Sequence, residues 1–354
     1  MSAHAVVTGS PIRLNPVTHT PNLVSRIRGS IAAALLLMLL LLQVTPASAA
    51  EDVDAIRAAT TWLMAQQSAD GSFPGFSGEP DPGMTADAIV AMAAAQGFDV
   101  DVEDALRRAA VWLVANGADA ATADPSQAAR MTLAALAIGA DPRDINGFDL
   151  IDAILNAPGV EAPVLPGAIG DNLYSHALSI IALARAGEPI DPQWIEVFRT
   201  TQAESGAWAF DGSTAPESLD SNTTALVLQA FIAAGFRDDP ALVEGFAALE
   251  EFHTENGYIS YLGMDADSNS TAVVLQALIA NGEAADSSAM NDTLLDLAAM
   301  LNPSGALSYG NGDDSDNLFS TVQAIPVVAE YAHQLEELCA AEGTSSESVC
   351  DTGA

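Results

Sequence analysis

The sequence predicts an all-α domain in which six pairs of helices close into a ring. Six aspartates recur 43 to 49 residues apart, each before a mostly apolar run of helical length; they are Asp81, Asp124, Asp171, Asp220, Asp267 and Asp316. A glycine stops the first five runs 15 or 16 residues later, at Gly97, Gly139, Gly187, Gly235 and Gly282. Aspartate is favoured as an N-cap and glycine just beyond a helix C-terminus. We therefore expect each run to be one helix of a repeated unit.

The fifth run indicates that these helices lie inside the domain. Ala272 to Ala280 is apolar on every side except at Gln276. A helix that is apolar all round is either enclosed by protein or spans a membrane, and this one is too short to span. The expected inner helices cover residues 84–96, 126–138, 173–186, 222–234, 267–282 and 317–333.

An amphipathic helix is predicted before each inner helix. In residues 102–116, for example, Leu106, Ala109 and Leu113 share one face at helical spacing, which is typical of an outer helix. The expected outer helices cover residues 53–67, 102–116, 148–156, 192–201, 240–253 and 288–301. An open solenoid is the alternative, but its inner helices would each keep an exposed face. A closed ring buries all six.

The first 49 residues have the pattern of a signal peptide with a long n-region. Arg26 and Arg28 precede the apolar run 31–42, and Ala47-Ser48-Ala49 has the small-x-small form of a cleavage site. A run of this length fits a signal h-region better than a transmembrane helix; an uncleaved anchor is the alternative. We expect cleavage near Ala49 and a secreted or extracytoplasmic mature protein.

The mature chain is strongly acidic. All 47 Asp and Glu residues follow Ala49, against 8 Arg and no Lys, which gives a formal net charge of −39. Such a surface repels nucleic acid and anionic membranes. We therefore expect neither nucleic-acid binding nor stable membrane insertion after cleavage, and we expect a monomer. A solvated surface is the simpler role of this charge, and cation binding is the alternative.

The C-terminal residues 336–354 are predicted to form a flexible tail after a helical domain over 50–335. Cys339 and Cys350 are the two cysteines of the chain, and both lie in this tail. In an oxidising compartment we expect them to form a local disulfide.

A sequence motif adds a family resemblance. Trp62-Leu63-x3-Gln67-x3-Gly71-x-Phe73 resembles the QW repeat of terpenoid cyclases, with Phe where the last Trp usually stands. Gln202-x3-Gly206-x-Trp208 keeps the second half of that repeat. The resemblance, over roughly residues 51–335, is to the α/α toroid superfamily. This includes squalene and terpene cyclases, the β subunits of protein prenyltransferases and cobalamin carriers such as transcobalamin and intrinsic factor. It implies six inner and six outer helices.

The cyclase resemblance implies a proton donor at the start of one inner helix. Class II terpene cyclases have Asp-x-Asp-Asp-Thr-Ala there, and Asp265-Ala-Asp267-Ser-Asn-Ser-Thr271-Ala272 is similar in outline. When Thr271-Ala272 is aligned, however, Asn269 and Ser270 take the places of the last two carboxylates. An amide cannot supply the proton. The remaining catalytic candidates are Asp265, Asp267, Asp314 and Asp316.

The prenyltransferase resemblance raises the question of metal ligands. Those enzymes hold zinc with Asp, Cys and His, but here the toroid region has no Cys and its three His lie in separate units. Zinc is therefore not expected. Asp265, Asp267 and Asn269 have the 1-3-5 spacing of a calcium loop, although Ser270 and Gln276 replace its Gly and Glu. Calcium at these residues is the alternative to a chain without a cofactor.

In such a ring the inner helices run parallel, so their aspartates gather at one end. We expect an acidic mouth there, flanked by amides and aromatic turn residues, although capping alone also accounts for the aspartates. The predicted ligand rim comprises Asp81, Asp171, Asp220, Asn222, Asp267, Asn269, Asp316, Trp208, Tyr258, Tyr261 and Tyr309, and Tyr174 lies in an adjoining turn.

The leading functional hypothesis is a secreted, non-enzymatic toroid. It would bind a small, partly apolar ligand or an extracellular protein partner at this mouth, in the manner that the cobalamin carriers suggest. A divergent terpenoid-cyclase-like isomerase is the enzyme alternative, and a structural extracellular module is the third hypothesis.

Overall fold

The computed structural model describes residues 49–156, 165–310 and 312–342, with side chains from residue 53 to residue 337 of these ranges. The predicted signal peptide and cysteine side chains lie outside the described residues. The described residues belong to one compact unit. Of the helices described, none combines the length and apolar character needed to cross a membrane.

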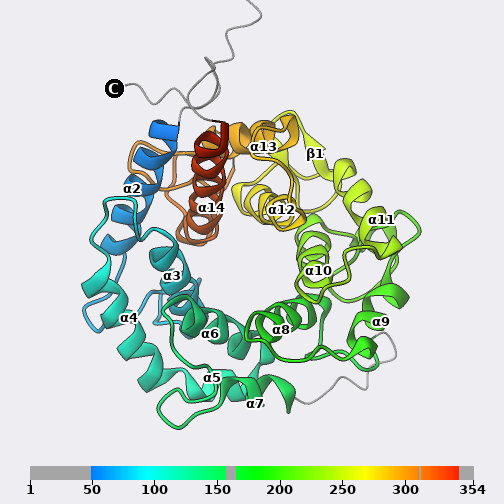
Figure 1. The fold of residues 1–354 in the computed structure, drawn as a ribbon, viewed down its shortest axis with the longest axis horizontal. Coiled ribbons are helices and arrows are strands. Elements are labelled where there is room, and N and C mark those ends of the chain that lie inside the picture. Colours follow the sequence, from blue (N-terminus) through cyan, green and yellow to red (C-terminus); the bar gives the residue numbers. More distant parts are fainter. Residues whose placement is uncertain (1–48, 157–164, 311, 343–354) are drawn as a thin grey trace, which may run out of the picture. The chain divides into compact units, whose positions relative to one another are not determined.

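Six inner helices surround the centre of this unit (Figure 1). They are α3 (Pro82–Ala94), α6 (Pro125–Ala137), α8 (Leu173–Arg185), α10 (Ser221–Ala233), α12 (Ser268–Asn281) and α14 (Leu318–Glu342). Each packs against the next, and α14 packs against α3, so the ring closes. The expected α/α toroid is thus confirmed. Helix α14 continues to Glu342, so the expected domain boundary at residue 335 falls inside this helix.

The outer helices form the periphery of the ring (Figure 1). They are α2 (Ala49–Ala65), α4 (Glu103–Asn116), α7 (Leu150–Leu155), α9 (Pro192–Thr201), α11 (Pro240–Leu249) and α13 (Ser288–Ala298). A further short helix, α5 (Ala118–Ala123), was not predicted. Helix α11 ends four residues early, because the chain continues through the 3-10 helix η2 (Glu250–Phe252) into a hairpin of β1 (His253–Thr254) and β2 (Gly257–Tyr258). Another 3-10 helix, η1 (Pro216–Ser218), precedes α10.

Four of the six predicted aspartate caps are confirmed. Each side chain accepts a hydrogen bond from a backbone N–H of its helix's first turn; they are Asp81, Asp124, Asp220 and Asp267. In the other two units the prediction is wrong by one residue. Asn172 accepts from Ser175 N at 2.7 Å and Asn317 from Ser320 N at 2.9 Å. Asparagine caps helices as well as aspartate does, so sequence preference alone does not distinguish the two positions. All five glycine stops have positive φ.

One buried side chain in each of five inner helices binds the turn that precedes the helix. Thr224 is typical: its hydroxyl accepts from Trp208 N at 3.0 Å and donates to Asp220 O at 2.7 Å. Thr85, Thr271 and Thr321 make the same pair of bonds in their units. In α8 the ring of His176 accepts from the turn instead, through Ile169 N at 3.0 Å. Because a buried N–H must be paired, this contact fixes each turn against its helix.

Aromatic residues fill the space between the inner and outer layers. Trp208 is fully buried and its ring lies 6.2 Å from that of Phe231 in α10, while Phe198 of α9 lies 5.5 Å from Phe231. The indole N–H of Trp208 donates to Phe198 O at 2.8 Å. The last residue of the QW-like motif is therefore a core residue whose single donor is satisfied.

The glutamine and glycine of the QW-like motif join one unit to the next. The amide N–H groups of Gln67 reach Gly71 O and Ala105 O, and those of Gln202 reach Gly206 O and Ala241 O, all within 3.0 Å. The glycine itself lies against the backbone of the next outer helix. The same arrangement closes the ring, because a Cβ on Gly305 would lie 2.6 Å from the carbonyl carbon of Ala58 in α2.

Replacement of Gly305 by alanine should therefore destabilise the ring at its closure. Gly282→Ala is the matched control, since Gly282 also has positive φ but has open space around it. We expect the control to cost about 1–2 kcal/mol for the left-handed backbone, and Gly305→Ala to cost about 1–3 kcal/mol more for the overlap. Urea denaturation of both variants measures the difference. Equal losses would show that the closure at Gly305 tolerates a side chain.

Candidate functional site

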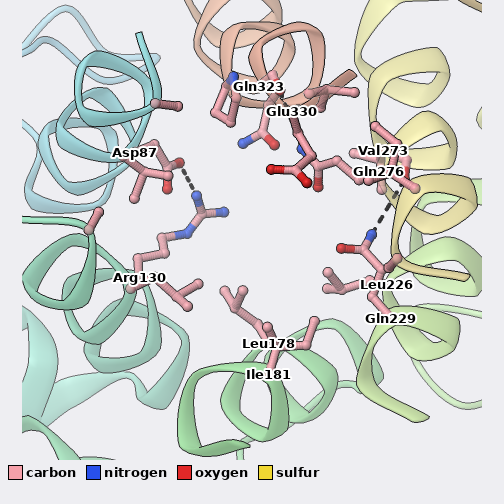
Figure 2. A pocket seen from close by; sticks show the side chains of 18 of the residues that line it. Asp87, Arg130, Leu178, Ile181, Leu226, Gln229, Val273, Gln276, Gln323 and Glu330 are labelled. Atoms are coloured by element: carbon pink, nitrogen blue, oxygen red, sulfur yellow. Dashed lines mark hydrogen bonds and ion pairs between the residues drawn. The ribbon is translucent and has the colours of Figure 1, made fainter. Parts of the chain in front are cut away.

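A cavity of about 630 Å³ lies at the centre of the ring, between the inner helices. All six inner helices contribute side chains to its wall (Figure 2). Ligand sites of small molecules typically have volumes of about 300–1,000 Å³ and mostly apolar walls with a few convergent polar groups. The central cavity is the candidate functional site on these grounds.

The cavity wall is built in layers that follow the repeat. Positions are counted from the inner-helix residue that binds the preceding turn, or from the equivalent Ala128 in α6. The side chains two positions after it form the first layer: Asp87, Arg130, Leu178, Leu226, Val273 and Gln323. Those five positions after it form the second layer: Val90, Leu133, Ile181, Gln229, Gln276 and Pro326. A third layer lies nine positions after it: Ala94, Ala137, Arg185, Ala280 and Glu330. This spacing keeps all three layers on the same helix face.

The cavity opens toward the C-terminal ends of the inner helices. Ala137, Arg185 and Glu330 of the third layer are exposed. At the opposite end Asp220 and Asp267 are only 3% and 2% exposed. There the backbone N–H groups of Ser221 and Ser268 donate to Ser260 O and Tyr309 O in the following loops, at 3.0 and 2.8 Å. The predicted acidic mouth is therefore wrong for these two aspartates, because the loop of the next unit covers them.

A cationic side chain is fixed in the first layer. Arg130 forms an ion pair with Asp87 of the neighbouring helix and donates to the hydroxyl of Tyr174 at 3.0 Å (Figure 2). Both charged side chains are 15% exposed. Burial opposes the charge on Arg130, but the carboxylates around it, Asp87 foremost, outweigh burial and raise its pKa. Arg130 is thus a permanent cation whose remaining N–H groups are available on the cavity wall.

Two glutamines occupy equivalent positions in the second layer. Gln229 donates to Val273 O at 3.4 Å and Gln276 to Gln323 O at 3.3 Å, so each amide N–H bridges to the next inner helix. Their carbonyl oxygens are free to accept from a molecule in the cavity. Leu178 and Ile181 of α8, which lies between α6 and α10, present only apolar surface (Figure 2). The cavity wall therefore combines a few polar groups with apolar surface.

The predicted rim residues lie elsewhere. Trp208 and Tyr258 are core residues, with 0% and 4% exposure, and cannot belong to a rim. Tyr261 and Tyr309 are exposed on the covering loops. The other predicted rim residues are half-buried (Asp81, Asn222), buried (Asp220, Asp267, Asn269) or exposed (Asp171, Asp316). None of these eleven lines the central cavity, whereas Tyr174 does.

The four catalytic candidates are also outside the cavity. Asp265 and Asp314 are exposed on loops. Asp267 accepts from the N–H and hydroxyl of Ser270 at 2.7 and 2.8 Å, and burial raises its pKa. Asp316 accepts from the side chains of Ser304, Asn302 and Trp62, and the Ser304 hydroxyl foremost lowers its pKa. Asp267 thus caps a helix, and Asp316 ties chain segments together.

No metal centre is assembled within the described part of the chain. No group of three or more His, Cys, Asp or Glu side chains has an arrangement that could hold an ion. Of the calcium-loop residues, Asp265 is exposed while Asp267 and Asn269 are buried, and the Asp267 oxygens already accept from Ser270. Asp267 thus caps α12.

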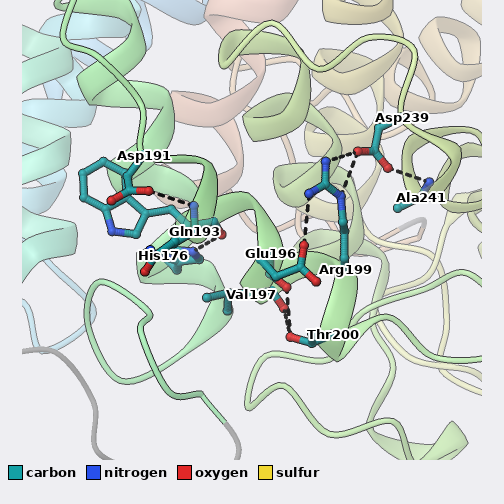
Figure 3. Close-up of polar contacts among 10 residues, drawn as sticks. His176, Asp191, Gln193, Glu196, Val197, Arg199, Thr200, Asp239 and Ala241 are labelled. Atoms are coloured by element: carbon teal, nitrogen blue, oxygen red, sulfur yellow. Dashed lines mark hydrogen bonds and ion pairs between the residues drawn. The ribbon is translucent and has the colours of Figure 1, made fainter.

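His176 has a structural position rather than a catalytic one (Figure 3). Its Nδ1 accepts from Ile169 N and its Nε2 faces Trp194 O at 2.9 Å, an arrangement that needs the neutral Nε2–H tautomer. Burial lowers its pKa to about 4. On the outer wall nearby, Arg199 donates to Glu196 and to Asp239, which in turn caps α11 at Ala241 N (Figure 3).

Sequence reasoning missed most of the cavity residues. Asp87 and Arg130 are each the one charged residue of their inner run, and Gln229 and Gln276 interrupt runs that are otherwise apolar after the first turn. Burial of a polar group costs free energy unless it is paired, so such exceptions signal either a partner or a site. That signal was present in the sequence, and it marks positions that face the cavity.

Structural comparison shows the same fold in proteins of different activity. The type II terpene cyclase MstE from Scytonema superposes with a TM-score of 0.59 at 17% identity, over 80% of this chain and 98% of that one. The α-1,6-mannanase GH76A of a Salegentibacter species gives 0.61 at 11% identity, over 80% and 99%. A protein from Actinoplanes gives 0.57 at 17% identity, over 79% and 99%. No protein-family model matches the chain, and no curated protein matches its sequence. At these identities the likeness shows the fold alone.

The cap at Asp267 should respond to substitution as a helix cap. Asp267→Ala removes the acceptor for Ser270 N and should lower the free energy of unfolding by about 1–2 kcal/mol. Asp267→Asn keeps an acceptor and should cost much less. Thermal and urea unfolding of both variants test this. An equal loss for the two substitutions would mean that the negative charge, and not the capping bond, matters at this position.

His176 should make the stability fall in mildly acidic solution. Its pKa is about 4 in the folded chain against about 6.5 in an unfolded one. The unfolded state therefore binds the proton more tightly, and stability is lost as pH falls from about 6.5 to 4, by at most about 3 kcal/mol. His176→Thr, which places the residue of the other units there, should flatten this part of the curve. The difference between the two pH curves isolates His176 from the many carboxylates, and parallel curves would contradict its role.

Proposed function

We propose that this protein binds a small, neutral and partly apolar molecule in its central cavity without transforming it. The observation on which the proposal depends is the wall of that cavity: a fixed guanidinium and two amides lie among apolar side chains of the inner helices. A ligand that carries a few hydrogen-bonding groups on an otherwise apolar body is complementary to such a wall.

The charges of the cavity favour a neutral ligand. Arg130 is balanced by Asp87 in the first layer, and Arg185 faces the opposite charge of Glu330 in the third. Moving an ion from water into the cavity costs free energy unless an unpaired opposite charge in the cavity compensates for the lost hydration. Hydroxyl, carbonyl or amide groups of a ligand can pair with Arg130, Gln229 and Gln276 without that cost.

The same residues argue against the isomerase alternative. A proton donor must touch its substrate, and the four candidate aspartates do not line the cavity. Asp87 and Glu330 do line it, but the carboxylate of Asp87 is paired with Arg130, and Glu330 is exposed at the open end. The likeness of fold to a terpene cyclase supplies no such donor.

We further propose that the protein works outside the cytoplasm as a monomer. The support is the N-terminal sequence pattern of residues 1–49 and the acidic composition of the rest. A net charge of this size favours separation of copies in solution. A cofactor is not required for binding of this kind.

The first test is native mass spectrometry of the full secreted chain, purified from its own extracellular fraction. We expect a stoichiometric adduct of a few hundred daltons, the size that the cavity accommodates. A parallel sample with a chelator identifies any mass that comes from bound calcium. A bare chain in both samples would contradict the proposal.

Two variants locate the adduct. Val90→Trp places a large side chain on the cavity wall and should abolish the adduct, whereas Val111→Trp makes the same change on the exposed face of α4 and should leave it unchanged. Circular dichroism melts confirm that both variants fold. An adduct that survives Val90→Trp in a folded protein would place the ligand outside the cavity.

A further inference from the structure

Exposed apolar side chains gather on four consecutive loops at the closed end of the ring. They are Phe76, Phe210, Tyr261, Leu262, Met264 and Tyr309, with exposed fractions from 39% for Tyr261 to 87% for Phe76. We call this set the loop rim. Its loops precede α3, α10, α12 and α14. Aromatic residues and Met are enriched at protein interfaces, and a contiguous apolar surface with polar surroundings marks an interaction site.

Backbone bridges join three of these loops, and a ring contact joins the fourth to α14. Asp220 pairs with Tyr261, and Asp267 with Gly310, as isolated antiparallel bridges between neighbouring loops. The ring of Phe76 lies 5.2 Å from that of Phe319 in the first turn of α14. The loop rim therefore follows one arc over adjacent units, and its members are not scattered over the molecule. A preorganised surface of this kind loses little entropy when it binds.

The surroundings of the loop rim are acidic. The loop segments 66–81, 202–220, 250–267 and 299–317 contain neither Arg nor Lys. Their exposed carboxylates include these six: Glu79, Asp211, Glu217, Asp265, Asp313 and Asp314. Within the described residues none of these six forms an ion pair. These carboxylates are thus available to pair with cationic groups of a partner.

The carboxylates act directly on a tyrosine of the loop rim. Burial of part of its ring, together with the neighbouring charges of Asp220 and Asp211, raises the pKa of Tyr261. The one basic side chain of these loops, His253, is already paired with Asp296 at 3.3 Å on the outer wall. The potential at the loop rim is accordingly negative.

We propose that the loop rim docks a cationic amphipathic segment of a partner protein. Apolar side chains of the segment would pack on the exposed aromatic and aliphatic residues, and its Lys or Arg side chains would approach the six carboxylates. Charge disfavours a second copy of this chain as the partner, since 47 acidic residues oppose 8 Arg. An anionic lipid surface is excluded by the same repulsion.

The probe for this surface is a fluorescent amphipathic helical peptide made of Leu and Lys, with a Leu and Glu peptide as its control. Fluorescence anisotropy should show binding of the first peptide only. Leu262→Ser with Met264→Ser should weaken binding about tenfold or more, as expected for anchors at the centre of an interface. Val111→Ser with Val243→Ser removes two exposed aliphatic residues of the outer wall and should change the affinity less than about twofold.

A second pair of variants tests the charge. Asp313→Asn with Asp314→Asn should weaken binding and reduce its dependence on salt, because screening acts on the charges that were removed. Glu244→Gln with Asp292→Asn makes the same charge change on the outer helices α11 and α13 and should have little effect. A nonspecific attraction to an acidic protein would instead respond equally to both pairs and would overturn the proposal.

Three further outcomes would overturn it. They are an absence of peptide binding by the wild-type chain, binding of phosphatidylserine vesicles, and self-association that the loop-rim variants abolish. The cavity variant Val90→Trp should bind the peptide like the wild type, so loss of the cavity ligand and loss of peptide docking can be told apart.

Discussion

The fold depends on one buried contact, in which an inner-helix side chain accepts the backbone N–H of the turn that precedes the helix. Thr85, Thr224, Thr271 and Thr321 do this with a hydroxyl and His176 with Nδ1. A hydroxyl both accepts and donates, so each threonine also binds the carbonyl of its cap residue. The turn, the cap and the helix are thereby fixed as one body. His176 keeps an acceptor at this position of α8, whereas Ala128 at the same position of α6 has none.

This contact decides which end of the ring is closed. Once the turn is fixed, its loop lies over the N-terminus of the neighbouring inner helix and supplies the carbonyls for Ser221 N and Ser268 N. The helix ends that would otherwise attract a ligand through their free N–H groups are already paired. The central cavity is consequently open at the C-terminal ends, where small side chains such as Ala94, Ala137 and Ala280 line it. The two ends of the molecule thus differ, with the open cavity at one and the loop rim at the other.

Much of the fold followed from residue patterns because the determinants are local. Asp81, Asp124, Asp220 and Asp267 could be assigned as caps, since an aspartate bonds N–H groups only two or three residues away. The two shifted caps arose where Asp171-Asn172 and Asp316-Asn317 offer two equivalent acceptors in succession. At the second of these sites, neighbouring side chains determine which residue is the cap. The Asp316 carboxylate accepts hydrogen bonds from Trp62, Asn302 and Ser304, so Asn317 caps α14.

The amino-acid sequence by itself determined the number of helix pairs, the apolar faces of the inner helices and the acidity of the loops, because each depends on the period and chemistry of residues close in the chain. The tertiary structure alone decided which polar residues meet. Asp87, Arg130 and Tyr174 come from three different units, and their distances follow from how neighbouring helices pack. Packing also decided the surroundings of Asp220 and Asp267. The sequence pattern predicted that they lie at an open mouth, but in the structure a loop covers them. Burial depends on what other units cover, and no local pattern contains that information.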